Sequence, residues 1–257
     1  MARIISIANQ KGGVGKTTTA INLASCLGQM GRRVLLIDMD PQGNAGRGLG
    51  FDVTAQHDTI FDVLTGEISL LQAIQATRFD NLQIVCANLR LASLEASLYT
   101  NPTQKPFALL KNALDPYRDG FDYIIIDCPP SLGLLSINSM AASDSVIVPV
   151  QCEYFAMEAV AAILSSIANI QKDLNPNLSI AGFLLTMFDS SNQLDNEIAN
   201  EIRRLFKENA FYTAIPRNQS VSESQARHMP VNYFRATSKG AVAYTSFARE
   251  VIEHESK

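Results

Sequence analysis

The sequence predicts an α/β fold in which a doubly wound, mostly parallel sheet is flanked by helices, built as a single domain over residues 1–257. Apolar strand-like runs alternate with helical stretches, which is the pattern of a parallel sheet covered on both faces. A chain of this length with 47% hydrophobic residues can bury a large core as one domain. A glycine-rich turn between the first predicted strand and the first predicted helix is typical of such sheets.

The predicted strands are short apolar runs, and the predicted helices lie between most of them. The strands cover residues 4–8, 34–38, 82–86, 123–127, 145–150 and 180–187, with a weaker one over 211–214. The helices cover residues 17–30, 158–174, 194–207 and 239–253. Gly31 and the break Asn175-Pro176-Asn177 mark the ends of the first two helices. Residues 43–60 follow neither pattern, so we expect an irregular surface segment there.

Composition excludes several classes of protein. No apolar stretch is long enough to span a membrane, and the first strand begins too close to Met1 for a cleavable signal, so we expect a cytoplasmic protein. The cysteines are widely spaced without a C-x-x-C pair, which favours reduced, mostly buried thiols over a disulfide or zinc site. The histidines are isolated from other metal-ligand types and are assigned no role. These residues are Cys26, Cys86, Cys128 and Cys152, and His57, His228 and His254.

Residues 9–18 read Asn-Gln-Lys-Gly-Gly-Val-Gly-Lys-Thr-Thr and directly follow the first predicted strand. An ordinary phosphate-binding P-loop reads G-x-x-x-x-G-K-[ST]; here Gln10 replaces the first glycine and a second lysine, Lys11, is present. Glycines let successive backbone N–H groups converge on phosphate oxygens, and the helix that begins near Thr17 adds its positive dipole end. The segment therefore predicts a nucleoside triphosphate as ligand.

Individual roles follow from the P-loop pattern. Lys16 is predicted to bridge the β- and γ-phosphates, and the Thr17 hydroxyl to ligate Mg²⁺. The other residues expected to contact the nucleotide are Lys11, Gly12, Gly13, Val14, Gly15 and Thr18. A glycine-rich turn without a ligand is the alternative for the loop as a whole, and a solvated lysine is the alternative for Lys11.

Acidic residues follow two of the predicted strands. Asp38 ends the strand over residues 34–38, and Asp40 follows two residues later. Both lie at the edge where doubly wound sheets bind ligands. One of them can support the loop while the other positions a water at the γ-phosphate, and Asp40 is the better catalytic candidate. Asp127 ends the strand over 123–127 like a Walker B acid, and we expect it to orient Mg²⁺ through a water. A role in capping the next turn is the alternative for Asp38 and Asp127.

Several segments together closely resemble the ParA/Soj partition ATPases, and the resemblance spans nearly the whole chain. These segments are residues 11–18, Asp40-Pro41-Gln42-Gly43-Asn44, Asp127-Cys128-Pro129-Pro130-Ser131, Pro149-Val150-Gln151-Cys152-Glu153-Tyr154 and Ile215-Pro216-Arg217-Asn218. The loop alone resembles the wider class of deviant Walker A proteins, which includes MinD-type and nitrogenase-iron-type ATPases. The later segments favour the ParA/Soj branch of these P-loop NTPases.

The resemblance implies an ATPase that needs ATP and Mg²⁺, hydrolyses ATP slowly and acts as a switch. In such a switch, two subunits sandwich two ATP molecules, and Lys11 of each subunit reaches the nucleotide of its partner. Gly12 is then small because the two loops approach closely, and Asp40 activates the attacking water. Pro216 and Asn218 are implied to frame the adenine.

The resemblance also implies partners. In this family the ATP-bound homodimer binds DNA without sequence preference on the nucleoid, and a ParB-type DNA-binding protein stimulates hydrolysis and release. The net charge of −4 does not predict DNA binding, although basic residues outnumber acidic ones between residues 200 and 250. Where relatives usually carry two arginines, this chain has Ser191 and Ser220. We therefore expect weakened DNA binding, or binding through other arginines, namely Arg203, Arg204, Arg227 and Arg235.

Three other classes of protein were weighed. A MinD-like ATPase that cycles on membranes would need a C-terminal amphipathic helix rich in lysine and leucine, but residues 251–257 read Val-Ile-Glu-His-Glu-Ser-Lys. An iron–sulfur reductase would need paired cysteines at a dimer interface, and only Cys128 has a suitable place. The strongest alternative is an orphan protein of the same fold that positions a protein cargo, with weak or no DNA binding.

Overall fold

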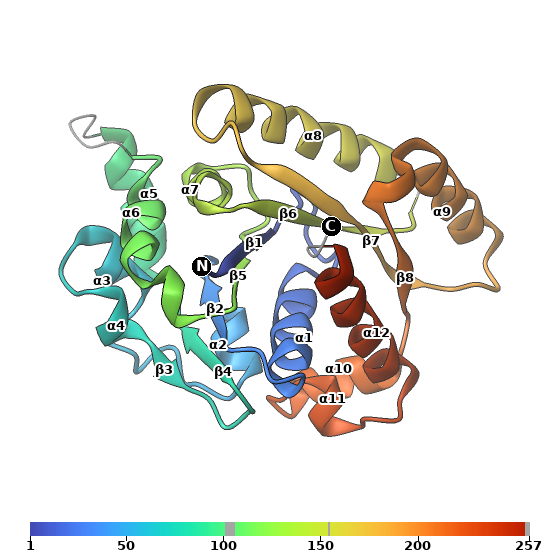
Figure 1. Ribbon diagram of the computed structural model, residues 1–257, viewed down its shortest axis with the longest axis horizontal. Coiled ribbons are helices and arrows are strands. Elements are labelled where there is room, and N and C mark those ends of the chain that lie inside the picture. Colours follow the sequence, from blue (N-terminus) through green and yellow to red (C-terminus); the bar gives the residue numbers. More distant parts are fainter. Residues whose placement is uncertain (101–105, 154, 255–257) are drawn as a thin grey trace.

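The computed structural model describes residues 1–100, 106–153 and 155–254 and contains an eight-stranded sheet (Figure 1). The strand order is β3-β4-β2-β5-β1-β6-β7-β8. Only β3 runs antiparallel to its neighbour among the described strands, which confirms the predicted doubly wound, mostly parallel sheet. The strands are β1 (Arg3–Ile7), β2 (Val34–Asp38), β3 (Gln75–Ala76), β4 (Leu82–Val85), β5 (Tyr123–Asp127), β6 (Ser145–Gln151), β7 (Ser179–Phe188) and β8 (Ala210–Pro216).

Helices cover both faces of the sheet (Figure 1). They are α1 (Lys16–Gln29), α2 (Asn44–Gly48), α3 (Ile60–Thr65), α4 (Leu70–Ala73), α5 (Arg90–Thr100), α6 (Leu109–Leu114), α7 (Leu134–Ala142), α8 (Ala156–Asp173), α9 (Gln193–Phe206), α10 (Gln219–Ala226), α11 (Val231–Phe234) and α12 (Lys239–His254), with 3₁₀ turns η1 (Asp115–Gly120) and η2 (Lys207–Asn209). Each predicted helix or strand boundary lies within two residues of the observed one.

Two hydrophobic cores lie on opposite faces of the sheet. Successive side chains of a strand point to opposite sides, so Ile4 of β1 packs with α3 to α9, whereas Ile5 and Ile7 pack with α1, α2, α11 and α12. Every residue of β2 and β5 is buried. Burial on both faces explains why these strands read as continuous apolar runs.

Residues 49–59 form neither helix nor strand, as expected, but the expectation of an irregular surface segment was wrong for residues 44–48 and for the buried positions. The segment begins with helix α2, and Ala45 and Val53 are among its buried residues. Its packing is close, because a Cβ added at Gly46 would lie 2.7 Å from the Val53 side chain and 3.1 Å from the Cys86 sulfur. Alternating polar and apolar residues in a short helix leave little periodic signal, so tertiary packing rather than local pattern defines this segment.

The cysteines are all buried and free, and burial raises the pKa of the Cys26 thiol to about 11. Among the described residues, no group of three or more His, Cys, Asp or Glu side chains is placed to hold a metal ion. In the same part of the chain, no helix combines the length and apolar character that crossing a membrane requires. His228 forms a hydrogen bond through Nδ1 with the Arg47 carbonyl at 2.8 Å.

Candidate nucleotide-binding and hydrolysis site

The predicted site residues come together at the carboxyl ends of the central strands. In the strand register, Ile7 of β1 and Asp38 of β2 each lie opposite Asp127 of β5. The P-loop leaves β1 at this level and leads into α1. The parallel topology therefore places the loop and both strand-end carboxylates at one edge of the sheet, where doubly wound folds bind ligands.

The backbone of the P-loop has the shape of an anion site. Gly13 and Gly15 have φ angles of 77° and 87°, in the left-handed region that favours glycine. Helix α1 begins at Lys16, and no side chain caps its N-terminus. Its first backbone N–H groups and its positive dipole end are therefore available to a phosphate.

Two buried polar side chains anchor the loop to neighbouring strands. Asn9 donates from Nδ2 to the Pro149 carbonyl at 2.7 Å, and its Oδ1 accepts the Lys11 N–H at 3.0 Å. Thr186, near the end of β7, donates from Oγ1 to the Val14 carbonyl at 2.9 Å. The loop is thus held between β6 and β7 before any ligand arrives.

Lys16 occupies a charged and nearly closed environment. The residue is 7% exposed, and its Nζ donates to the Lys11 carbonyl at 3.0 Å. Burial lowers the pKa of Lys16, while the nearby Asp127 and Asp40 carboxylates raise it. The amine therefore lies between the loop and the acids.

Asp38 supports the segment that follows β2. Its carboxylate accepts backbone N–H groups from Asp40 at 3.0 Å, Ala45 at 2.9 Å and Gly46 at 3.2 Å. Burial raises the pKa of Asp38 to about 7, and these three hydrogen bonds oppose that shift. These hydrogen bonds go to the turn after β2 and to the first turn of α2, so Asp38 takes the capping role that was the alternative for it.

Asp127 is fully buried and poorly satisfied. Neither of its carboxylate oxygens has a full hydrogen-bond partner among the described residues. Burial raises its pKa well above the ordinary value, the Asp38 carboxylate raises it further, and interaction with the Thr17 hydroxyl lowers it. Buried oxygens without partners are rare, so this carboxylate is suited to a bound water or cation.

A cavity of about 280 Å³ lies at the P-loop. It is lined by Gly12, Gly13, Gly15, Lys16, Thr17, Thr18, Asp40, Asn44 and Pro130. Asp40 is held there because one of its oxygens accepts the Gln42 N–H at 2.9 Å. The two aspartates after β2 therefore differ: Asp38 turns into the protein and Asp40 borders the cavity, rather than both pointing the same way as an extended chain predicts.

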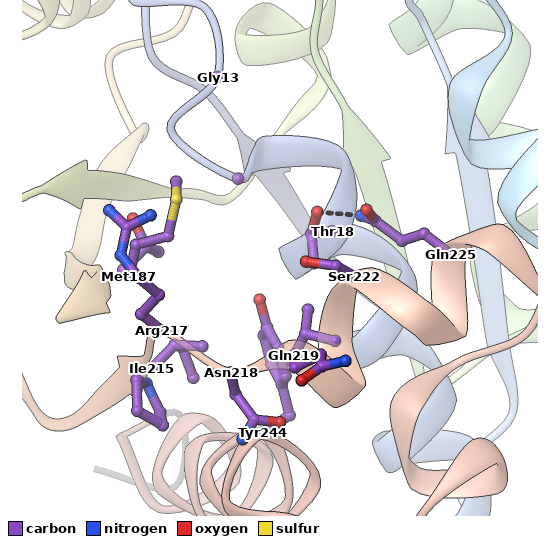
Figure 2. A pocket seen from close by; sticks show the side chains of 14 residues that line it. Gly13, Thr18, Met187, Ile215, Arg217, Asn218, Gln219, Ser222, Gln225 and Tyr244 are labelled. Carbon is purple, nitrogen blue, oxygen red and sulfur yellow. Dashed lines mark hydrogen bonds between the residues drawn. The ribbon is translucent and has the colours of Figure 1, made fainter. Parts of the chain in front are cut away.

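A second cavity, of about 450 Å³, lies on the other side of the loop between α1, β7, β8 and α10 (Figure 2). Pro216 and Asn218, the residues expected to frame adenine, both line it. The Asn218 Oδ1 is buried without a hydrogen-bond partner among the described residues. Gln225 on α10 donates to the Thr18 hydroxyl, which joins this cavity to the start of α1.

Several residues of the larger cavity were missed from the sequence. Thr186, Met187, Arg217 and Tyr244 all line it. Met187 has a φ of 50°, which is uncommon for a residue other than glycine and concentrates at functional sites. The signal available in advance was the position of Thr186 and Met187 at the carboxyl end of a predicted strand.

Lys11 lies outside both cavities and forms an ion pair with Glu153. Glu153 belongs to the segment between β6 and α8 and was given no role from the sequence. The lysine is therefore not simply solvated, which was the alternative for it.

The arginines considered for DNA binding do not form one cluster. Arg203 and Arg204 lie on α9, whereas Arg227 and Arg235 follow α10 and α11, which Figure 1 shows well apart from α9. Arg204 is paired with Glu201 on the same helix.

The two serines that replace expected arginines have different surroundings. The buried Ser220 accepts a hydrogen bond from Arg235 Nη1 at 3.3 Å. Ser191 lies in the loop after β7 and donates from its hydroxyl to Asp189 at 2.6 Å. A guanidinium group is thus present beside position 220 although it comes from another residue.

Fold and site define a P-loop ATPase of the α/β class, and comparison with known proteins agrees. The family model of the AAA domain matches residues 2–180. The chain is 45% identical over 251 residues to the sporulation initiation inhibitor protein Soj of Bacillus subtilis, with 98% of each chain covered. It is 44% identical over 255 residues to the chromosome partitioning protein ParA of Myxococcus xanthus, with 99% of this chain and 89% of that protein covered.

A solved structure shares both fold and sequence. It is described as cobyrinic acid a,c-diamide synthase from Mycobacterium smegmatis with a bound ATP analogue and magnesium. Its TM-score is 0.88 and its identity 36%, with 99% of this chain and 96% of that chain covered. The chain belongs to the ParA/Soj family of partition ATPases.

Proposed function

We propose that this protein is an ATP-dependent dimerising switch ATPase that partitions a chromosome or plasmid. The observation that carries the proposal is the convergence of Lys16, Thr17 and Asp40 on one cavity beside the unpartnered carboxylate of Asp127. Phosphoryl transfer to water needs a phosphate cradle, a cation held by an acid and a group that positions the water. The P-loop, Asp127 and Asp40 are the candidates for these three roles at this edge of the sheet.

Thr17 and Asp127 fit a Mg²⁺ site. Hydroxyl and carboxylate oxygens are the hard ligands that Mg²⁺ prefers, and this ion usually keeps several of its waters. A Mg²⁺-bound water would satisfy the two buried Asp127 oxygens that lack partners. The ion would neutralise charge on the β- and γ-phosphate oxygens. The ATP analogue and magnesium in the Mycobacterium smegmatis structure support the same pair of cofactors here.

Side-chain and backbone groups of the protein would bind the phosphates and orient the attacking water. The Lys16 amine would exchange the Lys11 carbonyl for the β- and γ-phosphates, and the phosphate charge offsets the burial that disfavours its ammonium form. Asp40 would accept a hydrogen bond from the attacking water and orient it toward the γ-phosphate. The backbone N–H groups at Gly13, Gly15 and the start of α1 would bind the other phosphate oxygens.

The larger cavity is the proposed adenine site. Its volume suits a purine and ribose, and Pro216 offers a flat apolar face. Asn218 carries both donors and an acceptor in its amide, which adenine can match through its amino group and ring nitrogen. The unpartnered Oδ1 of Asn218 supports this role.

The proposed dimer joins two P-loop faces. A Cβ added at Gly12 would meet no atom of the described residues within 4 Å, so packing within this part of one subunit does not require glycine there. Close approach of a second loop supplies a reason for the small residue. Lys11 of each subunit would then contact the nucleotide of its partner, which makes dimer formation depend on the charge of the γ-phosphate.

The proposed DNA partner is duplex DNA of any sequence, and the proposed partner that stimulates ATP hydrolysis is a ParB-type protein. Because the candidate arginines lie in two separate groups, we propose that the group of Arg227 and Arg235 contributes most. Arg235 already reaches position 220, where relatives usually carry arginine. The second candidate function is the positioning of a protein cargo, favoured by Ser191 in place of the other arginine.

DNA binding separates the two functions. We expect the protein to bind duplex DNA of arbitrary sequence with ATP but not with ADP, and to lose affinity steeply as salt rises. Fluorescence anisotropy over a salt series measures this, and the double variant Arg227→Ala with Arg235→Ala should weaken binding more than Arg203→Ala with Arg204→Ala. A dimer that forms with ATP but binds no DNA at low salt would favour the protein-cargo function.

The hydrogen bond by which Thr186 anchors the P-loop gives a separate prediction. Thr186→Val keeps the shape of the side chain but removes the hydrogen bond to the Val14 carbonyl, so we expect ATP affinity to fall by roughly 2-fold to 10-fold. Thr186→Ser retains the hydroxyl and should bind ATP like the wild type. Titration calorimetry checks both variants, and equal affinity of the valine variant and wild type would contradict the anchoring role.

A further inference from the structure

Lys11 is tied at two points to residues 149–153, which run from the end of β6 into the segment before α8. Its Nζ forms an ion pair with the Glu153 carboxylate, 142 residues later in the chain. Its backbone N–H reaches the same segment indirectly, because it donates to Asn9 Oδ1 and Asn9 Nδ2 donates to the Pro149 carbonyl. Main chain and side chain of this lysine are therefore both positioned by the end of β6.

The ion pair lies at the surface rather than at the phosphates. The side chains of Lys11 and Glu153 are 30% and 47% exposed, and neither residue lines the phosphate or adenine cavity. Glu153 is itself held in a turn, since its N–H donates to the Gln151 carbonyl at 2.9 Å and its carbonyl accepts the Ala156 N–H at 2.8 Å. The carboxylate is thus presented to Lys11 from a turn that precedes α8.

We propose that Glu153 is a positioning residue that holds Lys11 in the single subunit and must release it before two subunits join around ATP. This inference rests on the proposed function, in which Lys11 crosses to the nucleotide of the partner. In the proposed dimer, the Lys11 ammonium exchanges the Glu153 carboxylate at the surface of its own subunit for a phosphate of the other subunit. The carboxylate therefore competes with that phosphate, and a triphosphate, which carries more negative charge than a diphosphate, competes better.

The expected size of the effect follows from the exposure of the pair. A partly exposed ion pair changes an equilibrium by about 1.5-fold to 5-fold. Assembly of a symmetric dimer breaks two such pairs, so the dimer dissociation constant changes by the square, about 2-fold to 25-fold. Glu153 would thus weaken dimer formation in the absence of ATP without preventing it.

The test compares Glu153→Gln, which keeps the size of the side chain and removes its charge, with Glu158→Gln as control. Glu158 lies in the first turn of α8, which follows the segment of Glu153, and is exposed. Analytical ultracentrifugation with a nonhydrolysable ATP analogue should show dimers about 2-fold to 25-fold tighter for Glu153→Gln and unchanged for Glu158→Gln. With ADP, Glu153→Gln should also raise the dimer fraction. An unchanged or weaker dimer for Glu153→Gln would overturn the proposal.

A second measurement needs no dimer. In nucleotide-free protein, the Lys11 amine should react faster with an acylating reagent in Glu153→Gln than in the wild type, as read by mass spectrometry of the modified peptide. Equal reactivity would overturn the holding contact itself. If reactivity rises but even the wild type forms no dimer with the ATP analogue, the dimer switch of the proposed function fails and the gating role fails with it. If the wild type dimerises and Glu153→Gln does so equally, the gating role alone is overturned.

Discussion

Replacing Asp40 by alanine is expected to slow ATP hydrolysis by about 10²-fold to 10⁴-fold, the contribution typical of a positioned proton acceptor. ATP binding should be nearly unchanged, because Asp40 borders the phosphate cavity without holding the P-loop. The variant should therefore accumulate as an ATP-bound dimer. Single-turnover hydrolysis with radiolabelled ATP, together with ultracentrifugation, measures both properties.

Asp38 provides the matched control for this variant. Its carboxylate accepts three backbone N–H groups in the protein interior, so Asp38→Ala should lower the free energy of unfolding by at least about 2 kcal/mol. Asp40→Ala should leave thermal stability close to that of the wild type. If Asp40→Ala hydrolysed ATP at the wild-type rate, or if it lost activity only because it unfolded, the assignment of Asp40 as the water-positioning residue would be wrong.

Alanine variants of the two P-loop lysines are expected to lose different steps, ATP binding for Lys16 and dimer formation for Lys11. Lys16→Ala removes a charged donor that is nearly buried beside the phosphate cavity, and we expect ATP affinity to fall at least about 100-fold. Lys11→Ala removes a surface amine outside that cavity, so a single subunit should bind ATP within roughly 3-fold of the wild type. The dimer should nevertheless be lost, because the cross-subunit contact is gone.

Nucleotide titration at low protein concentration and ultracentrifugation at high concentration separate these steps. Lys11→Arg is the control for charge, since it keeps a cation at the surface with a different shape. Equal loss of ATP binding in both alanine variants would place Lys11 in the nucleotide site of its own subunit. A stable ATP dimer of Lys11→Ala would exclude the crossing contact.

Long elements of the fold were predictable because their signals are local. Strands buried on both faces, such as β2 and β5, read as continuous apolar runs, and the breaks at Gly31 and Asn175-Pro176-Asn177 mark the ends of α1 and α8. The two-residue strand β3 and the short helix α2 have no such signal, because a few residues do not establish a period. Packing against Val53 and Cys86, rather than local preference, defines the position of Gly46.

The candidate site was predictable to a similar extent. Lys16 and Thr17 follow from one contiguous motif, and Asp40 and Asp127 follow from the rule that parallel strands end at a common ligand edge. The four arginines were grouped only because they are near one another in sequence. The structure places Arg203 and Arg204 on α9 and the other two after α10 and α11, since proximity along the chain does not imply proximity on the surface.

By itself the sequence determined the fold class, the phosphate loop and the two strand-end acids, because each depends on residues adjacent in the chain or on a regular period. Tertiary structure alone decided that Asp38 holds the start of α2 while Asp40 borders the cavity, and that Thr186 anchors Val14. It also decided that Lys11 is held by Glu153. These relations join segments separated by up to 172 residues, and only the folded sheet brings such segments within hydrogen-bonding distance.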